Sequence, residues 1–158
     1  MKSRNEQLRG VLGVIEKDGK YLFGLESKEG PMNNRWRLLG GKLEAGEDSS
    51  QALVRELREE AGIEVTVDGF LGTAQGNHRK ISIDVYHGRW VSGEIKPKLD
   101  ENSIVGWYSF LETFNMDVED LSMDMLCKYR AQQRAKLETT SSGPVSWPYM
   151  GCDAGAIR

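Results

Sequence analysis

The pattern of hydrophobic and polar residues predicts strands, a helix, further strands and a second helix, in that order. A run rich in Val, Leu and Ile covers residues 8–16, and a second apolar run, 20–25, follows Asp18-Gly19. An Asp-Gly pair between two apolar runs supplies the positive φ of a tight turn, so this region is predicted to be a β-hairpin. Short apolar runs or alternating apolar and polar positions predict further strands at 36–39, 63–71, 81–91 and 104–110.

Two segments have the period of an amphipathic helix. The first, residues 48–62, carries an apolar stripe of Leu53, Val54, Leu57 and Ala61. Asp48 can cap this helix, with Gln51 three residues later as in a capping box, and Gly62 is a natural C-terminal stop. The second helix, residues 121–137, has an apolar stripe of Leu121, Met125 and Tyr129. Because both stripes must be buried, we expect an α/β fold with a mixed β-sheet between helices on its two faces.

Composition and charge narrow the functional classes. The chain has 158 residues, and we expect one domain over 1–138 and a C-terminal tail over 139–158, which has no helical or strand period. Its 21 Lys and Arg against 24 Asp and Glu give a net charge of -3, which excludes a general polyanion binder with an extended basic surface. No apolar run approaches the ~18 residues of a membrane span. Two cysteines, in no zinc or disulfide pattern, favour a reducing cytoplasm.

Three carboxylates fall on one side of the first predicted helix. Glu56, Glu59 and Glu60 have the spacing i, i+3, i+4, which places them within an arc of roughly 100° at the margin of the apolar stripe. Like charges this close repel, and hard divalent cations such as Mg²⁺ relieve the repulsion by binding carboxylate oxygens. The alternative is a solvated acidic face in which Arg55 and Glu59 form an i, i+4 ion pair.

The residues around this helix resemble the Nudix box, G-x5-E-x7-R-E-U-x-E-E-x-G-U, where U is an aliphatic residue. The segment GKLEAGEDSSQALVRELREEAGI fills every fixed position of that box, with Gly41, Glu47, Arg55, Glu56, Leu57, Glu59, Glu60, Gly62 and Ile63. So many fixed positions make a far more specific signal than a lone glycine motif. The order and length of the elements up to residue 137 also resemble the Nudix fold, an α/β/α sandwich.

The resemblance implies a hydrolase that cleaves a nucleoside diphosphate linked to another group, with Mg²⁺, or Mn²⁺ in its place. Glu59 and Glu60 would be metal ligands, and the carbonyl of Gly41 would add an oxygen. Glu56 would bind metal or act as the general base, since members of the family differ in this respect. Such a site suits a pyrophosphate, because hydrolysis of this highly charged group needs charge neutralisation and an in-line water.

Two further residues enter the site by the same resemblance. Arg55 would orient a glutamate, either Glu47 or Glu56, from behind the metal ligands. Glu101 precedes the last predicted strand, and in MutT-type members a glutamate at this place contributes to the metal site. A solvated turn is the alternative for Glu101.

The substrate-binding residues follow from likeness to one branch of the family. Residues 35–42 look like the MutT-type and eukaryotic oxidised-purine triphosphatases, but Arg37 stands where the eukaryotic enzyme has a base-reading asparagine. An arginine can reach a phosphate or a guanine edge. These triphosphatases read the purine with side chains near the second helix, where this chain has Asn115, Asp117 and Asp120. Capping of that helix is the alternative for these three residues.

The function that these residues favour is Mg²⁺-dependent hydrolysis of a nucleoside triphosphate to the monophosphate and pyrophosphate, as in removal of damaged nucleotides. Within the hydrolases, removal of pyrophosphate from RNA 5′ ends and cleavage of a nucleotide sugar stay open. A Nudix domain that senses a nucleotide without turnover is an alternative of another class. The expected partner is a small nucleotide, without a membrane or an extended nucleic-acid surface, and the sequence leaves a homodimer open.

Overall fold

The computed structural model describes residues 8–25, 34–76, 80–96 and 104–140. The strands in this part of the chain are β1 (Leu8–Lys17), β2 (Lys20–Leu25), β3 (Trp36–Arg37), β4 (Leu39–Lys42), β5 (Glu64–Gln75), β6 (Ile81–Ser92) and β7 (Ile104–Ser109). The helices are α1 (Ser49–Ala61), α2 (Phe110–Thr113) and α3 (Asp120–Thr140). The order of strands and helices predicted from the sequence is confirmed, with α2 as an addition.

The strands form a mixed sheet in the order β3-β2-β1-β6-β5, with β4 beside β1 and β7 beside β2. β1 and β6 run parallel, beginning with Leu8 opposite Ile81, and the other pairs of these strands are antiparallel. The predicted hairpin is confirmed, because Asp18 and Gly19 join β1 to β2 with φ values of 50° and 74°.

β1 and β2 separate beyond the hairpin, and residues 36–42 lie between them. β3 pairs with β2, whereas β4 pairs with β1. The change of partner occurs at Leu38, so the single strand predicted over 36–39 is in fact two short strands. Leu39 enters the core beneath α1 and Leu38 enters the core beneath α3, so both faces of the chain are buried where it changes partner.

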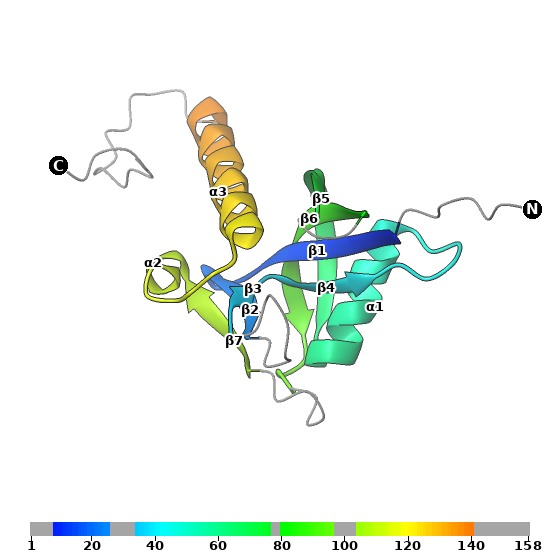
Figure 1. The fold of residues 1–158 in the computed structure, drawn as a ribbon. Coiled ribbons are helices and arrows are strands. Elements are labelled where there is room, and N and C mark those ends of the chain that lie inside the picture. Colours follow the sequence, from blue (N-terminus) through cyan, green and yellow to red (C-terminus); the bar gives the residue numbers. More distant parts are fainter. Residues whose placement is uncertain (1–7, 26–33, 77–79, 97–103, 141–158) are drawn as a thin grey trace, which may run out of the picture.

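Two hydrophobic cores lie on opposite faces of the sheet. The core beneath α1 includes Val11, Ile15, Leu53, Leu57 and Ile63. The core beneath α3 includes Leu12, Val14, Phe23, Val85 and Leu126. Neighbouring residues of β1 therefore enter different cores, as the alternation of side chains along a strand requires. With α1 and α3 on either side of the strands (Figure 1), the predicted α/β/α sandwich with a mixed sheet is confirmed.

The ends of α1 are fixed by the residues that the sequence indicated. Asp48 precedes the helix in an extended conformation, and its carboxylate accepts a hydrogen bond from Ser50 N–H at 3.4 Å, where the sequence pattern had suggested a capping box with Gln51. Gly62 ends the helix in the left-handed conformation, with φ 71°. The predicted stripe faces the sheet, with Val54 half-buried and the others fully buried, namely Leu53, Leu57 and Ala61.

α3 differs from its prediction in its ends and in its buried face. The helix begins at Asp120 and continues to Thr140, so the first two residues of the predicted tail are helical; residues 141–158 lie outside the described part. Leu121 and Met125 of the predicted stripe are only half-buried. The buried positions are Ser122, Leu126 and Tyr129. The face is rotated because the hydroxyl of Ser122 has a buried partner, the N–H of Leu38.

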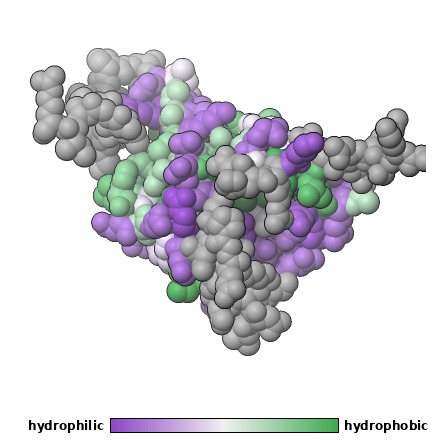
Figure 2. Space-filling view, in the orientation of Figure 1, coloured by the Kyte–Doolittle hydropathy of each residue, from purple (hydrophilic) through white to green (hydrophobic). Residues whose placement is uncertain are grey.

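α2 is a short helix that the apolar pattern alone did not predict. Its first turn is held by a capping box, in which Ser109 and Glu112 exchange side-chain and backbone hydrogen bonds. The exposed apolar side chains at this corner are Leu111 and Phe114. In the view of Figure 2, hydrophobic residues also gather at the side where α2 lies, and hydrophilic residues separate them from other hydrophobic areas.

No helix in the described ranges is both long enough and apolar enough to cross a membrane.

Replacement of Gly62 by alanine should lower the free energy of unfolding by about 1 kcal/mol, because a β-carbon is strained at φ 71°. The effect is conformational, since an added β-carbon would come no closer than 3.5 Å to its neighbours. For a domain of this size we expect a fall in Tm of roughly 2–4 °C. Gly62→Asn is the matched control and should cost less, since asparagine tolerates the left-handed region. Equal melting temperatures for the three proteins would contradict this account of the helix end.

Candidate active site

α1 lies close against the sheet at Gly41 of β4. A β-carbon added to Gly41 would lie 2.3 Å from the carboxyl carbon of Glu56 and 2.5–2.6 Å from its two oxygens. The carboxylate of Glu56 therefore occupies the space that any other residue at position 41 would need. Glycine at this position has a steric reason, and it brings the Glu56 carboxylate against the backbone of β4.

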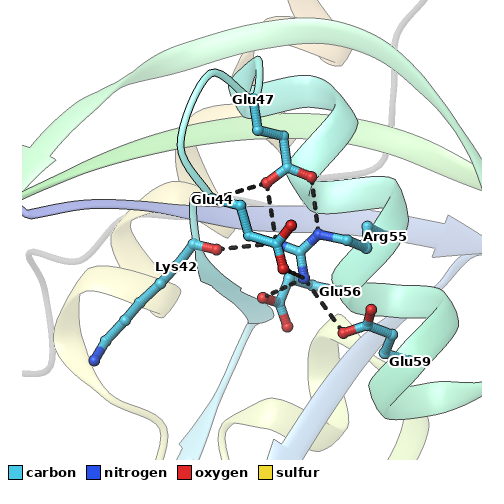
Figure 3. Close-up of polar contacts among 6 residues, drawn as sticks. All are labelled: Lys42, Glu44, Glu47, Arg55, Glu56 and Glu59. Atoms are coloured by element: carbon cyan, nitrogen blue, oxygen red, sulfur yellow. Dashed lines mark hydrogen bonds and ion pairs between the residues drawn. The ribbon is translucent and has the colours of Figure 1, made fainter.

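Arg55 connects this carboxylate with the loop before α1. Its Nε and Nη2 atoms donate to both oxygens of Glu47, at 2.8 and 3.0 Å. Its Nη1 donates to Glu56 Oε1 at 3.0 Å and to Glu59 Oε2 at 3.3 Å, and its Nη2 also donates to the carbonyl of Lys42 at 3.1 Å. Figure 3 shows the guanidinium surrounded by these groups. Sequence reasoning left Glu47 and Glu56 as alternative partners of Arg55, and the structure brings both to it.

The pairing of Arg55 with Glu47 perturbs both groups. The hydrogen bond from Arg55 holds the pKa of Glu47 below its usual value, and the backbone N–H of Glu44 adds to this effect. The same hydrogen bond raises the pKa of Arg55 further above its usual value. A carboxylate with a lowered pKa stabilises the fold above its unfolded-state pKa, and this contribution is lost as pH falls through the folded-state value. The loop before α1 is therefore held most firmly at neutral and alkaline pH.

The predicted metal-binding glutamates differ in exposure. The side chain of Glu56 is 14% exposed, whereas that of Glu59 is 50% exposed. Glu60 is half-buried on the same helix. Within the described residues, no three His, Cys, Asp or Glu side chains form a group that could hold a metal ion as they stand. Glu56 and Glu59 instead share Nη1 of Arg55 as a hydrogen-bond donor.

The donor set nonetheless fits a hard divalent cation. Four carboxylates lie within 4 Å of the guanidinium of Arg55, namely those of Glu44, Glu47, Glu56 and Glu59. Four formal negative charges against one positive charge leave an excess of three. Carboxylate and backbone carbonyl oxygens are the ligands that Mg²⁺ prefers, so one divalent cation beside Gly41 would offset two of these three charges. Glu101, predicted as a further metal ligand, lies outside the described residues.

Two of the predicted substrate-binding residues form ion pairs with Arg35. Its Nε lies 3.1 Å from Asp117 Oδ1, and its Nη2 lies 3.6 Å from Asp120 Oδ1. The same Nη2 donates to the carbonyl of Val118 at 3.0 Å. These contacts hold the segment before α3 against the start of β3, a connection that the sequence reasoning did not foresee. A contact of either aspartate with substrate stays a prediction.

The other two predicted substrate-binding residues have different settings. Arg37 is half-buried on β3, opposite Gly24 of β2. Asn115 is exposed in the turn after α2, where its N–H donates to the carbonyl of Glu112 at 3.0 Å. A contact of Arg37 or Asn115 with substrate stays a prediction.

A polar cluster around Asp84 anchors the start of α1 and was not predicted. Asp84 of β6 accepts hydrogen bonds from Ser49 at 2.6 Å, Thr73 at 2.9 Å and Arg9 at 3.0 Å. Burial would raise the pKa of Asp84, but these hydrogen bonds outweigh it and the pKa is lowered. Because Ser49 is the first residue of α1, the cluster ties α1 to β6. The alternation along β6 placed Asp84 on the polar face, with no sign that α1 would cover it.

Comparison with known proteins identifies the family of this chain. The NUDIX domain model matches residues 6–135, which is most of the chain. The chain belongs to the Nudix family. The resemblance first seen in the box residues is therefore confirmed over residues 6–135.

Individual relatives of this Nudix chain are similar over shorter segments. It is 42% identical over 77 residues to the CTP pyrophosphohydrolase of Escherichia coli (strain K12), covering 49% of this chain and 55% of that protein. It is 39% identical over 69 residues to the 8-oxo-dGTP diphosphatase of Proteus vulgaris, covering 43% of this chain and 62% of that protein. The chain thus spans little more than half the length of these relatives. The solution structure of the E. coli ORF135 protein is 28% identical, with a TM-score of 0.66 over 82% of this chain and 92% of that one.

Gly41→Ala should displace the Glu56 carboxylate, because the added methyl group would lie 2.3 Å from its carboxyl carbon. We expect nucleotide hydrolysis to fall by on the order of 10²-fold, as a displacement of about 1 Å in an active site can cause. Gly76→Ala is the control at the end of β5, where the nearest atom, Cβ of Ile81, would be 3.6 Å away. Rates measured at a temperature where both variants are folded decide the matter. Parental activity in Gly41→Ala would show that the Glu56 carboxylate need not lie against β4.

Proposed function

We propose that the protein is an Mg²⁺-dependent hydrolase that converts a nucleoside triphosphate to the monophosphate and pyrophosphate. The observation that supports it is the Glu56 carboxylate, seated against Gly41 and held by Arg55, which in turn is anchored on Glu47. A carboxylate fixed at the margin of a core, with further glutamates on the same helix turn, suits a reaction on a polyanion.

The metal would be held by the glutamates of α1 and by the backbone of β4. Mg²⁺, when bound to Glu56, Glu59, Glu60 and the carbonyl of Gly41, would neutralise phosphate charge and lower the pKa of a bound water. The protein's own part is to keep these oxygens in place. Arg55 limits the rotation of Glu56 by its bond to Oε1, and its paired bonds to Glu47 fix the guanidinium itself.

Glu56 is also the proposed general base if it is not a metal ligand. Its carboxylate is mostly buried and can accept a proton from a water that attacks phosphorus. Because Oε1 already accepts from Arg55, a protonated Glu56 would hold its proton on the other oxygen. Glu56→Gln would remove either a metal ligand or a general base, so this variant does not distinguish the two roles.

The names of two relatives support a free nucleoside triphosphate as the substrate. One relative is a CTP pyrophosphohydrolase and another is an 8-oxo-dGTP diphosphatase, so both pyrimidine and oxidised purine triphosphates belong in the first substrate panel. Arg37 and Asn115 are the proposed contacts to phosphate or base. Asp117 and Asp120 can join them only if the ion pairs with Arg35 open or are shared with the substrate. A cytoplasmic location and a homodimer stay predictions from the sequence.

Glu60→Gln should lower turnover by on the order of 10²-fold or more, because it removes a negative charge that the metal site needs. The control is Glu64→Gln, a glutamate at the start of β5 that pairs with Arg58 at the surface. We expect the control to retain parental turnover. Circular dichroism and Tm establish that both variants are folded. Turnover close to the parental value in folded Glu60→Gln would remove this residue from the metal site.

Hydrolysis in ¹⁸O-labelled water should place the label in pyrophosphate and leave the nucleoside monophosphate unlabelled. Water then attacks the β-phosphorus, the bond from this phosphorus to the bridging oxygen breaks, and the monophosphate leaves with that oxygen. The measurement is mass spectrometry of both products from the best substrate in a panel of normal and oxidised triphosphates with Mg²⁺. Label in the monophosphate, or release of inorganic phosphate with a diphosphate, would contradict this mechanism. Activity confined to 5′-triphosphate RNA or to nucleotide sugars would make that compound the substrate in place of a free triphosphate. Binding without turnover would indicate a nucleotide-sensing domain in place of an enzyme.

A further inference from the structure

The segment before α3 is locked to the point where the chain changes partner between β3 and β4. Trp36 N–H donates to the carbonyl of Asp117 at 2.8 Å, and Glu119 N–H donates to the carbonyl of Trp36 at 2.8 Å. These bonds make a short parallel bridge between Trp36 and Val118. Arg35 adds the side-chain contacts to Asp117 described above. α3, on one face of the sheet, is thus tied to β3, which Leu38 joins to β4, the strand that carries Gly41.

The innermost link is a single buried hydroxyl. Ser122 lies in the first turns of α3 and is completely buried, and its Oγ accepts a hydrogen bond from Leu38 N–H at 2.9 Å. Leu38 belongs to neither β3 nor β4, so its N–H lies outside the hydrogen bonds of the strand ladders. A buried backbone N–H without a partner is costly, and Ser122 supplies that partner from 84 residues further along the chain.

We propose that Ser122 is a positioning residue for the active site on the opposite face of the sheet; this inference rests on the proposed function. The hydroxyl fixes the backbone at Leu38, and Leu38 is followed directly by Leu39-Gly40-Gly41. Leu38 and Leu39 enter different cores, so the backbone between them cannot turn without exposing one of the two side chains. A shift at Leu38 is therefore passed along β4.

The tight contacts of β4 make the site sensitive to such a shift. A β-carbon at Gly40 would lie 1.9 Å from the carbonyl oxygen of Val11, and one at Gly41 would lie 2.3 Å from the carboxyl carbon of Glu56. The strand thus runs between the backbone of β1 and a carboxylate of α1 with almost no spare room. Ser122 sets the position at which β4 enters this space, although it touches neither substrate nor metal ligand.

Ser122→Ala tests the inference, with Thr113→Val as the matched control. Thr113 is also completely buried, and its hydroxyl donates to the carbonyl of Phe110 at 2.6 Å, away from β4. Both substitutions remove one buried hydroxyl, so both should lower Tm. Two readouts separate positioning from stability: amide hydrogen exchange at Gly40 and Gly41 without metal or substrate, and kcat with the Mg²⁺ concentration for half-maximal activity.

In Ser122→Ala we expect exchange at Gly40 and Gly41 to become about 10-fold faster or more and kcat to fall about 10- to 100-fold, with more Mg²⁺ needed for half-maximal activity. In Thr113→Val these quantities should stay within about twofold of the parental values. If Ser122→Ala does not fold, Ser122→Cys keeps a similar volume and a weak acceptor, and it should show smaller changes in the same direction.

Parental exchange at Gly40 and Gly41 together with parental kcat in a folded Ser122 variant would overturn the inference. Equal changes in the Thr113→Val control would also overturn it, because they would reduce the effect to general stability. A parental protein that hydrolyses no nucleotide overturns the proposed function, and with it the catalytic role of Ser122. Hydrogen exchange, which needs no turnover, distinguishes that outcome from a failure of the structural link.

Discussion

The guanidinium of Arg55 is the interaction on which the rest of the site depends. It satisfies both oxygens of Glu47, one oxygen each of Glu56 and Glu59, and the carbonyl of Lys42. Without a cation at this point, four neighbouring carboxylates would repel one another and the loop between β4 and α1 would lose its main anchor. One side chain therefore holds the loop, the helix and the end of the strand in a single arrangement, before any metal ion is present.

The local features of this arrangement could be predicted from the sequence. Asp18-Gly19 gave the hairpin, and Asp48 and Gly62 marked the ends of α1, because the conformation of each of these residues is decided within a few residues of the chain. The spacing of the box glutamates likewise gave their common side of the helix. The Nudix resemblance then supplied roles that the spacing alone left open between a metal site and a solvated face.

The features that the sequence did not predict depend on residues far apart in the chain. The break at Leu38 and the burial of Ser122 explain each other, but they are 84 positions apart. In the same way, Arg35 pairs with Asp117 across 82 positions, and nothing in the local pattern of either segment indicates the other. The apolar stripe predicted for α3 differs from the buried face because Ser122 is buried but polar, and a hydrophobic pattern does not include it. Only the packing of α3 against the sheet determines which face is covered.

The two glycines at the centre of β4 also limit how a protein with this fold can change over evolutionary time. Gly40 is closed to any side chain by the backbone of β1, and Gly41 is closed by the carboxylate of Glu56. A substitution at either position would need a compensating change in a different element. For Gly40 no such change is available, because the obstacle is backbone and not a side chain. Gly40 and Gly41 therefore cannot be replaced by single substitutions. Arg37, which is half-buried, and Asn115, which is exposed, are under no such constraint in the structure.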